Sequence, residues 1–333
     1  IDIIAKTNPI LIIDEPQSVE GKQTKERLKE FNPLLTLRYS ATHKADSIYN
    51  MVYRLDAMEA YNKRLVKKIA VKGITESGST ATEGFVYLES INLSKADPTA
   101  TIQFDYIGAK GLRKKTATVG IGYNLYDNSG ESGKLDEYKE GFVVKSIDGR
   151  DNSVEFLNGI KIFAGDVIGK VSEDQLRRIQ IRETILSHFE RERQLFHKGI
   201  KVLSLFFIDE VAKYKQYDEA GHPFNGPYAD MFEEEYNRVL SEMLPSFTDE
   251  AYLRYLSDPR NAASKVHQGY FSMDKKGKAV ESKERQGENE ERAFDLIMKD
   301  KERLLSLSEP VRFIFSHSAL KEGWDNPNVF QIC

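Results

Sequence analysis

Several short apolar runs in the chain end directly at acidic or small polar residues. The most apolar of them spans residues 200–208 and is followed by Asp209 and Glu210. Continuous apolarity over a few residues is typical of a parallel strand that is buried on both faces. We therefore expect an α/β chain whose parallel strands carry polar residues at their carboxyl ends. Similar runs predict strands at residues 9–13, 34–39, 311–315 and 329–333.

Composition narrows the kinds of protein that the chain can be. Its 333 residues, 40% of them apolar, are enough for two or three domains with their own cores. No run approaches the ~18 apolar residues of a membrane-spanning helix. The single cysteine, Cys333, excludes a disulfide framework and a cysteine-based zinc site, so a cytoplasmic location is expected. The net charge of −4 excludes an overall basic nucleic-acid coat but is compatible with a local basic groove.

The ends of the chain are unusual for a whole protein. The chain begins at Ile1 without a methionine or a signal-peptide pattern, and it stops inside the strand expected at 329–333. We therefore expect an internal piece of a longer protein.

The character of the sequence changes at about residue 76, where Gly, Thr, Ser and Asn become frequent. Alternating stretches and turn signals predict a small antiparallel β module there. Ser172 and Gln175 have the spacing of a capping box, which predicts a helix that ends at Gly199. The expected domains are the C-terminal part of a first lobe (1–75), the β module (76–170), a connecting helix (171–199) and a second lobe (200–333).

Local patterns predict further elements in the first and last domains. Residues 22–31 and 56–68 have helical potential, and residues 52–55 and 69–74 indicate short strands. Residues 211–310 are mostly polar, which predicts helix and loop with one strand at 266–272 and a solvated helix at 281–303.

Asp14 and Glu15 follow the first apolar strand directly. Ligands of open α/β sheets bind beyond the carboxyl ends of the strands, so two adjacent carboxylates there suit a nucleotide-hydrolysing site. Asp14 would hold Mg²⁺ through its water shell, and Glu15 would orient and deprotonate the attacking water. Taken alone, the pair also has an ordinary alternative, which is a strand that runs into a polar turn.

Two further polar segments follow expected strands. Small hydroxyl residues after strand 34–39 would hydrogen-bond back to the acidic loop and report its nucleotide state. After strand 311–315, Gly323 would allow close backbone approach, and Asp325 would accept a hydrogen bond from a ribose hydroxyl. The ordinary alternatives are a common turn and a strand–turn with a buried tryptophan. The hydroxyl segment is Ser40, Ala41 and Thr42, and the candidate contacts to nucleic-acid phosphates are Ser316, His317 and Ser318.

The order of these segments is more specific than any one of them. A strand with Asp-Glu-Pro-Gln, a strand with Ser-Ala-Thr and a later strand with Gly-x-Asp resemble motifs II, III and V of superfamily 2 helicases. The chain also resembles the Res subunit of type III restriction–modification enzymes over nearly its whole length, and the β module is the least specific part. The stretches that carry this resemblance are residues 12–17, 37–43, 201–209, 266–272 and 313–333.

The resemblance implies a motor that couples ATP hydrolysis to movement along double-stranded DNA. It implies ATP and Mg²⁺ as cofactors, a methyltransferase (Mod) subunit as partner and a nuclease domain further along the Res chain. Carried over to this sequence, Asp14 and Glu15 are the magnesium and water-activating pair, and Gln17 lies near the nucleotide. By the same resemblance the coupling motif is Ser40, Ala41 and Thr42, and the nucleotide-facing residues of the second lobe are Gly323 and Asp325.

Two motifs that the resemblance requires are missing from the 333 residues. No Gly-x-x-x-x-Gly-Lys-Ser/Thr phosphate loop occurs, and the arginine-rich motif VI would follow Cys333. Without the loop nothing cradles the β- and γ-phosphates. Without the arginine, transition-state charge is not stabilised, which is an effect of roughly 10³–10⁵ in rate. We therefore predict that this chain alone hydrolyses ATP negligibly.

Arg113, Lys114 and Lys115 form a basic cluster in the β module, with Tyr123 and Tyr126 nearby in the sequence. On a β hairpin they would contact DNA phosphates or act as a strand-separating pin. Alternatively, they would protect an exposed sheet edge from pairing with another chain. The sequence leaves both alternatives open.

The expected architecture is two RecA-like parallel-sheet lobes, the first one truncated, with a β-rich antiparallel insertion between them. Two alternative functions remain open, namely another superfamily 2 DNA motor and a non-catalytic nucleic-acid-binding scaffold.

Overall fold

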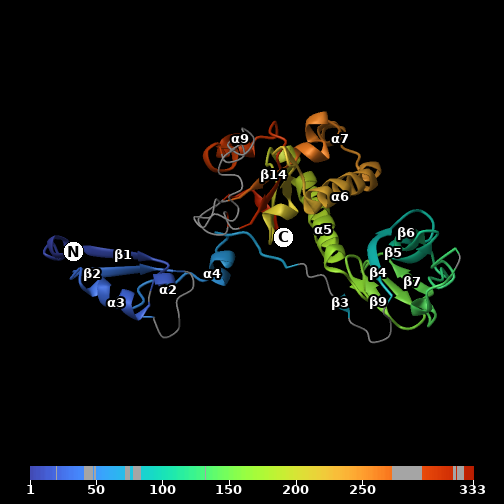
Figure 1. Cartoon of the computed structure of the whole chain (residues 1–333), viewed down its shortest axis with the longest axis horizontal. Coiled ribbons are helices and arrows are strands. Elements are labelled where there is room, and N and C mark those ends of the chain that lie inside the picture. Colours follow the sequence, from blue (N-terminus) through green and yellow to red (C-terminus); the bar gives the residue numbers. More distant parts are fainter. Residues whose placement is uncertain are drawn as a thin grey trace. The chain divides into compact units, whose positions relative to one another are not determined.

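The structure is a computed structural model that describes residues 1–19, 21–40, 48, 50–71, 76–77, 84–131, 133–271, 295–317, 320 and 326–333. Within these ranges the side chains of residues 17, 18, 22, 76 and 77 are not described. The chain forms two compact units, Ile1–Gly73 and Ile74–Cys333. Parallel and antiparallel sheets occur together with helices, which confirms the expected mixed α/β class (Figure 1).

The first unit contains a parallel pair of strands, β1 (Ile10–Asp14) and β2 (Leu35–Tyr39), joined by a helical crossover. Both strands agree with the apolar runs of the sequence. They pair in continuous register as far as Asp14 opposite Tyr39, so their carboxyl ends lie together. The helices of this unit are α1 (Asp2–Ala5), α2 (Pro16–Val19), α3 (Lys22–Lys29) and α4 (Ala57–Asn62).

The expectation that β1 is buried on both faces is wrong. Ile10 and Ile12 are 59% and 65% exposed, whereas Leu11 and Ile13 on the opposite face are half-buried. Successive side chains of a strand point to opposite faces, and one crossover can cover only one face of a strand pair. The apolar run therefore predicts the strand correctly but not the number of its covered faces.

Local predictions for residues 51–71 are wrong in part. Residues 51–56 form no strand, and neither do residues 69–71; residues 72–75 lie outside the described ranges. The helix expected at 56–68 is limited to α4, because Arg64 adopts the left-handed conformation (φ 58°) that ends a helix. Val52 and Val71 are 95% and 90% exposed, and a strand forms only where a partner satisfies its backbone groups.

The second unit begins with the β module. A five-stranded sheet has the order β3-β10-β4-β5-β6, and a three-stranded sheet has the order β7-β8-β9. All pairs are antiparallel except β10 with β3. One core takes buried side chains from both sheets, among them Phe104 and Phe156. The strands are β3 (Glu76–Ser77), β4 (Val86–Asn92), β5 (Thr99–Gly108), β6 (Gly111–Val119), β7 (Val144–Asp148), β8 (Ser153–Phe156), β9 (Lys161–Phe163) and β10 (Val167–Ile168).

A long helix, α5 (Glu173–Leu195), follows the β module. Ser172 and Gln175 form the predicted capping box, with hydrogen bonds of 3.3 and 3.1 Å. Gly199 ends the next turn in the left-handed conformation (φ 66°), as predicted. Both ends of this helical segment are therefore set by short-range signals in the sequence.

The rest of the second unit contains a four-stranded sheet with the order β14-β15-β11-β16, and all of its pairs are parallel. The carboxyl ends of the four strands therefore lie at one edge. Its strands coincide with four of the predicted runs, and they are β11 (Leu203–Phe207), β14 (His267–Tyr270), β15 (Phe313–Ser316) and β16 (Val329–Ile332).

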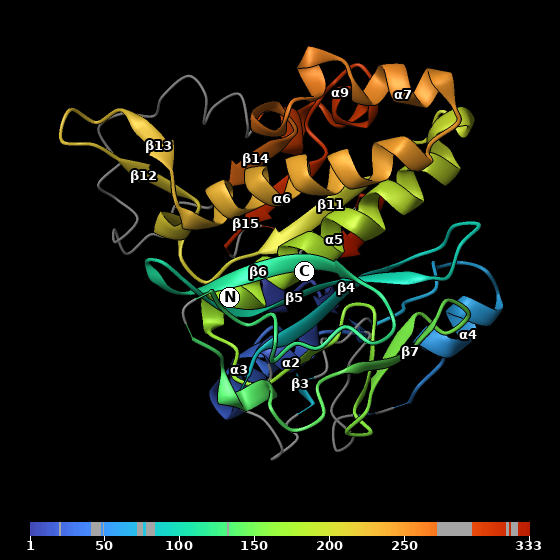
Figure 2. The ribbon, with the colours of Figure 1, turned by 90° about the vertical axis from the view of Figure 1, so that its right-hand side faces the viewer.

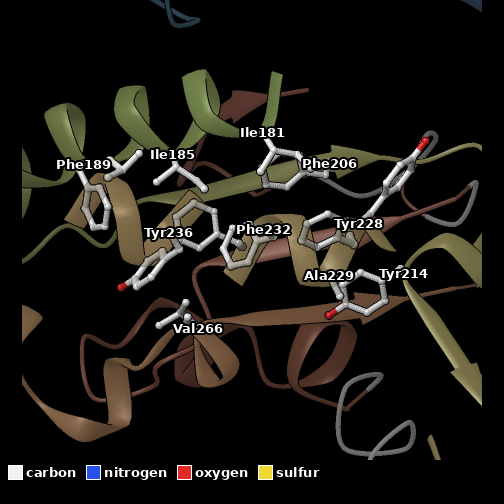
Figure 3. Packing of buried hydrophobic residues seen from close by; sticks show 14 of the residues in the cluster. Ile181, Ile185, Phe189, Phe206, Tyr214, Tyr228, Ala229, Phe232, Tyr236 and Val266 are labelled. Atoms are coloured by element: carbon white, nitrogen blue, oxygen red, sulfur yellow. The ribbon is translucent and has the colours of Figure 1, made fainter. Parts of the chain in front are cut away.

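The helices α5 and α6 (Pro227–Met243) lie side by side (Figure 2). Ile181, Ile185 and Phe189 of α5 point into a core that also receives Phe232 and Tyr236 of α6 (Figure 3). A helix is therefore present in residues 211–310, as expected, but α6 has a buried apolar face that the expectation of a mostly polar region missed.

Other parts of residues 211–310 also differ from the sequence expectation. The expected solvated helix at 281–303 falls largely outside the described residues, but Leu296 and Ile297 within it and Leu304 just after it are buried. The sequence pattern does not predict the hairpin of β12 (Lys215–Tyr217) and β13 (Pro223–Asn225). The remaining elements are α7 (Glu250–Leu256), α9 (Lys301–Leu305), a π-helical turn (Asp295–Lys299) and 3-10 turns at Asp136–Tyr138, Phe196–Lys198, Val211–Lys213, Leu244–Ser246, Pro259–Asn261 and Ala263–Lys265. Among the described helices, none combines the length and the apolarity needed to cross a membrane.

Candidate active site

The carboxylates of Asp14 and Glu15 lie at the carboxyl end of β1. Asp14 is the last residue of the strand and pairs with Tyr39 of β2. Glu15 still belongs to the ladder through its backbone, because its N–H donates to the Tyr39 carbonyl at 2.9 Å. The φ of Glu15 is 48°, in the left-handed region that residues other than glycine rarely adopt, and Pro16 then begins α2. This tight turn holds both exposed carboxylates at the strand end.

Ser40 links the end of β2 to the acidic turn. Its hydroxyl donates a hydrogen bond of 3.1 Å to Oε2 of Glu15. The expected contact from the strand-end hydroxyl back to the acidic loop is therefore present for this residue. Since β1 and β2 are parallel and in register, the first residue after each strand comes close to the other.

Asp14 and Glu15 fit the ligand preference of Mg²⁺. This ion prefers oxygen ligands and keeps several waters, so it needs only one or two carboxylates from a protein. In the part of the chain that the structure describes, no group of three or more His, Cys, Asp or Glu side chains is arranged to hold a metal ion. The pair therefore fits an ion that is held mainly through water, and it does not form a closed protein cage.

Several predicted site residues cannot be placed beside this pair. Ala41, Thr42, Ser318, Gly323 and Asp325 lie outside the described residues. The backbone of Gln17 lies in α2, but its side chain is not described.

Ser316 and His317 lie at the carboxyl edge of the parallel sheet in the second unit. Ser316 is the last residue of β15 and is fully buried, with no hydrogen-bond partner for its hydroxyl among the described residues. A phosphate does not reach a buried hydroxyl, so the structure adds no support to the DNA contact of Ser316, which stays a prediction. The next residue, His317, is exposed, and its contact with a nucleic-acid phosphate stays a prediction.

The three residues of the basic cluster lie on β6, which is an edge strand. Arg113 and Lys115 both lie over the ring of Tyr106, at 5.0 and 4.6 Å from its centroid. Lys114 points to the other face, where it forms a 2.5 Å ion pair with Asp105 and lies 3.6 Å from the ring centroid of Phe85. Consecutive strand residues alternate between faces, so the three cations do not form one continuous patch.

The second unit contains a buried polar network that sequence reasoning missed. Nη1 of Arg312 lies 2.8 and 2.7 Å from the two carboxylate oxygens of Glu192, and both side chains are fully buried. Tyr252 donates to the same carboxylate at 2.9 Å. Burial alone would raise the pKa of Glu192, but Arg312 and then His188 outweigh it and lower the pKa to about 2. Glu192 is therefore held as a carboxylate inside the fold.

His188 extends this network toward the parallel sheet. Its Nδ1 lies 2.8 Å from the hydroxyl of Ser204 on β11, and its Nε2 lies 3.5 Å from Glu192. Ser204 in turn donates to Gln331 on β16 at 3.0 Å. The Ser204–His188–Glu192 order resembles a nucleophile, base and orienting acid. All three are buried, and the carboxylate oxygens are taken by Arg312 and Tyr252, so the arrangement is structural.

The sequence holds little signal for this network. His188 and Glu192 have the i, i+4 spacing of one helix face, but Arg312 is 120 residues further along the chain. Lys201 is also buried and donates to the Glu309 carbonyl at 2.5 Å, and burial lowers its pKa to about 7. Local spacing in the sequence identifies neither Arg312 as the partner of Glu192 nor Glu309 as the partner of Lys201.

The fold and the site define a mixed α/β protein with paired carboxylates at the end of a parallel strand. The chain is 35% identical over its full length to the Res subunit of the type III restriction-modification enzyme EcoP15I of Escherichia coli, of which it covers 31%. It is 34% identical over 99% of its length to the EcoPI Res subunit of Escherichia phage P1, also covering 31%. It is 28% identical over 98% of its length to the StyLTI Res subunit of Salmonella typhimurium, covering 33%. No family model matches the chain, and no solved structure matches it significantly.

The chain is therefore Res-subunit-like, and the resemblance predicted from its motifs is confirmed. It spans about a third of the length of the curated relatives that it matches.

Proposed function

We propose that the chain is part of an ATP-driven DNA translocase, the motor of a type III restriction enzyme. The observation that carries the proposal is the turn after β1, where Ser40 donates to Glu15 beside Asp14. The similarity to Res subunits over the whole chain supports the same assignment.

In this proposal each residue of the turn has a separate role. Glu15 orients the attacking water and accepts its proton, for which the carboxylate must lie within hydrogen-bond reach of that water. Ser40 donates a hydrogen bond to Oε2 of Glu15 and so helps to orient this carboxylate. Asp14 binds the water shell of Mg²⁺. When bound, Mg²⁺ neutralises charge on the phosphates of ATP.

The remaining parts of the proposal concern the longer protein. The β1–β2 unit and the four-stranded parallel sheet would be portions of two RecA-like lobes, with Gly323 and Asp325 facing the nucleotide from the second lobe. Closure of the lobes around ATP and their reopening would move them along double-stranded DNA. His317 and two cations on one face of β6, Arg113 and Lys115, would contact DNA. A Mod subunit would supply site recognition, and a nuclease domain elsewhere in the longer protein would cut. The protein would work in the cytoplasm.

The proposal is tested in the full-length protein that contains this chain. DNA-stimulated ATP hydrolysis is measured for the wild type and for Glu15→Gln. The control is Glu30→Gln, which changes another exposed glutamate of the same unit. Removal of a general base lowers rates by roughly 10²–10⁴-fold, so we expect a loss of this size for Glu15→Gln and none for Glu30→Gln.

Other outcomes contradict the proposal. Wild-type hydrolysis that DNA does not stimulate would argue against a DNA motor. A full-length protein that binds DNA but does not hydrolyse ATP would favour a non-catalytic scaffold. Full activity of Glu15→Gln would remove Glu15 from the site.

A further inference from the structure

The β module contacts α5 and α6 through a cluster of charged residues that is largely shielded from water. The central residue is Glu89 on β4, whose side chain has no exposed surface. One of its oxygens accepts a hydrogen bond from Arg238 on α6, and the other lies 3.6 Å from Nη2 of Arg182 on α5. A single carboxylate of the β module is therefore bound by both helices.

The two arginines are fixed by further acids on α6. Arg182 is 3% exposed in its side chain and lies 2.6 Å from Glu242 and 3.4 Å from Glu235. Arg238 lies 3.2 Å from Glu242 and also donates to the hydroxyl of Thr116 on β6 at 3.2 Å. Each group in the cluster thus restricts the orientation of the next one.

Apolar contacts lie directly beside the charges. Phe85, Tyr87 and Val167 of the β module form a buried cluster with Ile179 of α5. Tyr87 also donates to Glu183 of α5 at 2.7 Å. The contact area therefore has an apolar part, which supplies attraction, and a charged part, which requires one geometry.

The helix α5 is shared by two cores. Ile179 near its beginning packs on the β module, whereas Ile185 and Phe189 further along pack in the core of α6 and the parallel sheet. A continuous helix of this length, Glu173–Leu195, spans about 35 Å, so one element takes part in both cores. In Figure 2, α5 and α6 lie beside β4, β5 and β6 of the module.

The charge of Glu89 makes the contact specific. Burial raises the pKa of this carboxyl, even though Arg182 and then Arg238 lower it. A buried carboxylate that moves away from its arginines leaves uncompensated charges on both sides, and such a loss is far more costly than that of an exposed ion pair. Small sliding motions that an apolar contact would permit are therefore opposed.

We propose that Glu89, Arg182 and Arg238 lock the β module to α5 and α6, so that the module and the parallel-sheet body of the second unit move as one. The three are positioning residues, which act through the orientation of the module. The proposal concerns mechanical coupling within the second unit, and it holds or fails independently of the proposed ATPase, because its test uses neither ATP nor DNA.

The test measures the distance between the β module and the parallel-sheet part of the second unit. Spin labels are placed at Leu157→Cys in the module and at Ser264→Cys beside the parallel sheet, in a Cys333→Ser background of the full chain; both labelled positions are exposed. We expect one narrow distance distribution for the otherwise unchanged chain and a broad or shifted one for Glu89→Gln. The matched control is Glu155→Gln, which removes a glutamate of the same module from a partly exposed 2.6 Å pair with Lys145. This control is expected to leave the distribution narrow.

Hydrogen exchange separates positioning from general instability. In Glu89→Gln, amides of β4 and of the first half of α5 are expected to exchange on the order of 100-fold faster, with β8 and β15 unchanged. If this variant does not fold, Arg238→Met serves instead, since Arg238 is 29% exposed in its side chain and its loss is milder. For Arg238→Met we expect the same pattern at roughly tenfold.

Three results would overturn the proposal. One is a broad distance distribution in the unchanged chain. Another is a narrow distribution in both variants of the cluster. The third is faster exchange throughout the module and the sheet, which would mean that the cluster only stabilises the fold.

Discussion

Glu15 in the first unit and Glu192 in the second both lie beside a parallel sheet, and both accept a hydrogen bond from a hydroxyl group. Ser40 donates to Glu15 at 3.1 Å, and Tyr252 donates to Glu192 at 2.9 Å. Glu192 is completely buried and is held by Arg312 through both carboxylate oxygens, whereas Glu15 is exposed.

The comparison teaches that the surroundings of a glutamate decide its role. A carboxylate whose oxygens are occupied by buried donors stabilises one arrangement of the chain and cannot bind water. A carboxylate that accepts a hydrogen bond and is also exposed is oriented and still accessible to solvent. The first description fits Glu192 and the second fits Glu15, which is why the candidate chemistry lies at β1 and not in the buried network.

Removal of Arg312, the buried partner of Glu192, is expected to have the largest effect on stability. In Arg312→Met the charge of Glu192 stays buried without its partner, so we expect a loss of about 3–5 kcal/mol in the free energy of unfolding. Denaturant unfolding of the chain measures it. The control is Arg260→Met, whose arginine forms an exposed pair with Asp258 at 2.7 Å and should leave the midpoint unchanged. Equal effects of the two variants would show that burial does not distinguish them.

A smaller effect is expected from pH, through His188. Burial lowers the pKa of this histidine below its ordinary value of 6.5. The unfolded chain therefore binds the proton more readily, so this contribution to stability is present above pH 6.5 and is lost as the pH falls below it. His188→Asn keeps a polar group near Ser204 and removes the titration. We expect its unfolding free energy to fall less than that of the wild type between pH 6.5 and 5. The control is His222→Asn at an exposed site, which should behave as the wild type; an unchanged slope in His188→Asn would contradict the account.

The smallest effect is expected for DNA binding by the surface of the β module. It tests the same distinction, between a charged side chain that is exposed and one that is paired within the protein. Arg113 is exposed, whereas Lys114 is paired with Asp105 at 2.5 Å. If β6 contacts DNA phosphates, Arg113→Gln should reduce the slope of log affinity against log salt by about 1, and Lys114→Gln should not change it. DNA binding of the full-length protein at several salt concentrations measures the slope. An unchanged slope in Arg113→Gln would favour the alternative that these cations protect a sheet edge.

Local signals in the sequence predicted much of the fold. The apolar runs predict β1, β2, β11, β15 and β16, and continuous apolarity matches real burial in β11 and β15 but not in β1. The capping residues of α5 predict where the helix begins, because a cap involves only residues that are neighbours in the sequence. For α6 the apolar spacing is present, but the acids between Phe232 and Tyr236 obscure it.

Contacts between distant residues could not be predicted in the same way. Glu89 and Arg238 are 149 residues apart, and Glu192 and Arg312 are 120 residues apart. Nothing in a single sequence indicates which of many charged residues will be buried together. The candidate site can be predicted from the sequence only in part. Its acidic turn is a local motif, whereas the contact from Ser40 to Glu15 depends on the pairing of β1 with β2.

The most direct test of the central claim compares Glu15→Gln with Glu192→Gln in the full-length protein. ATP turnover per folded molecule is measured below the melting temperature of both variants, and the melting temperature is recorded for each. The account predicts that Glu15→Gln loses turnover at an unchanged melting temperature, and that Glu192→Gln lowers the melting temperature and keeps its turnover. Full turnover in Glu15→Gln, or lost turnover in folded Glu192→Gln, would contradict the account.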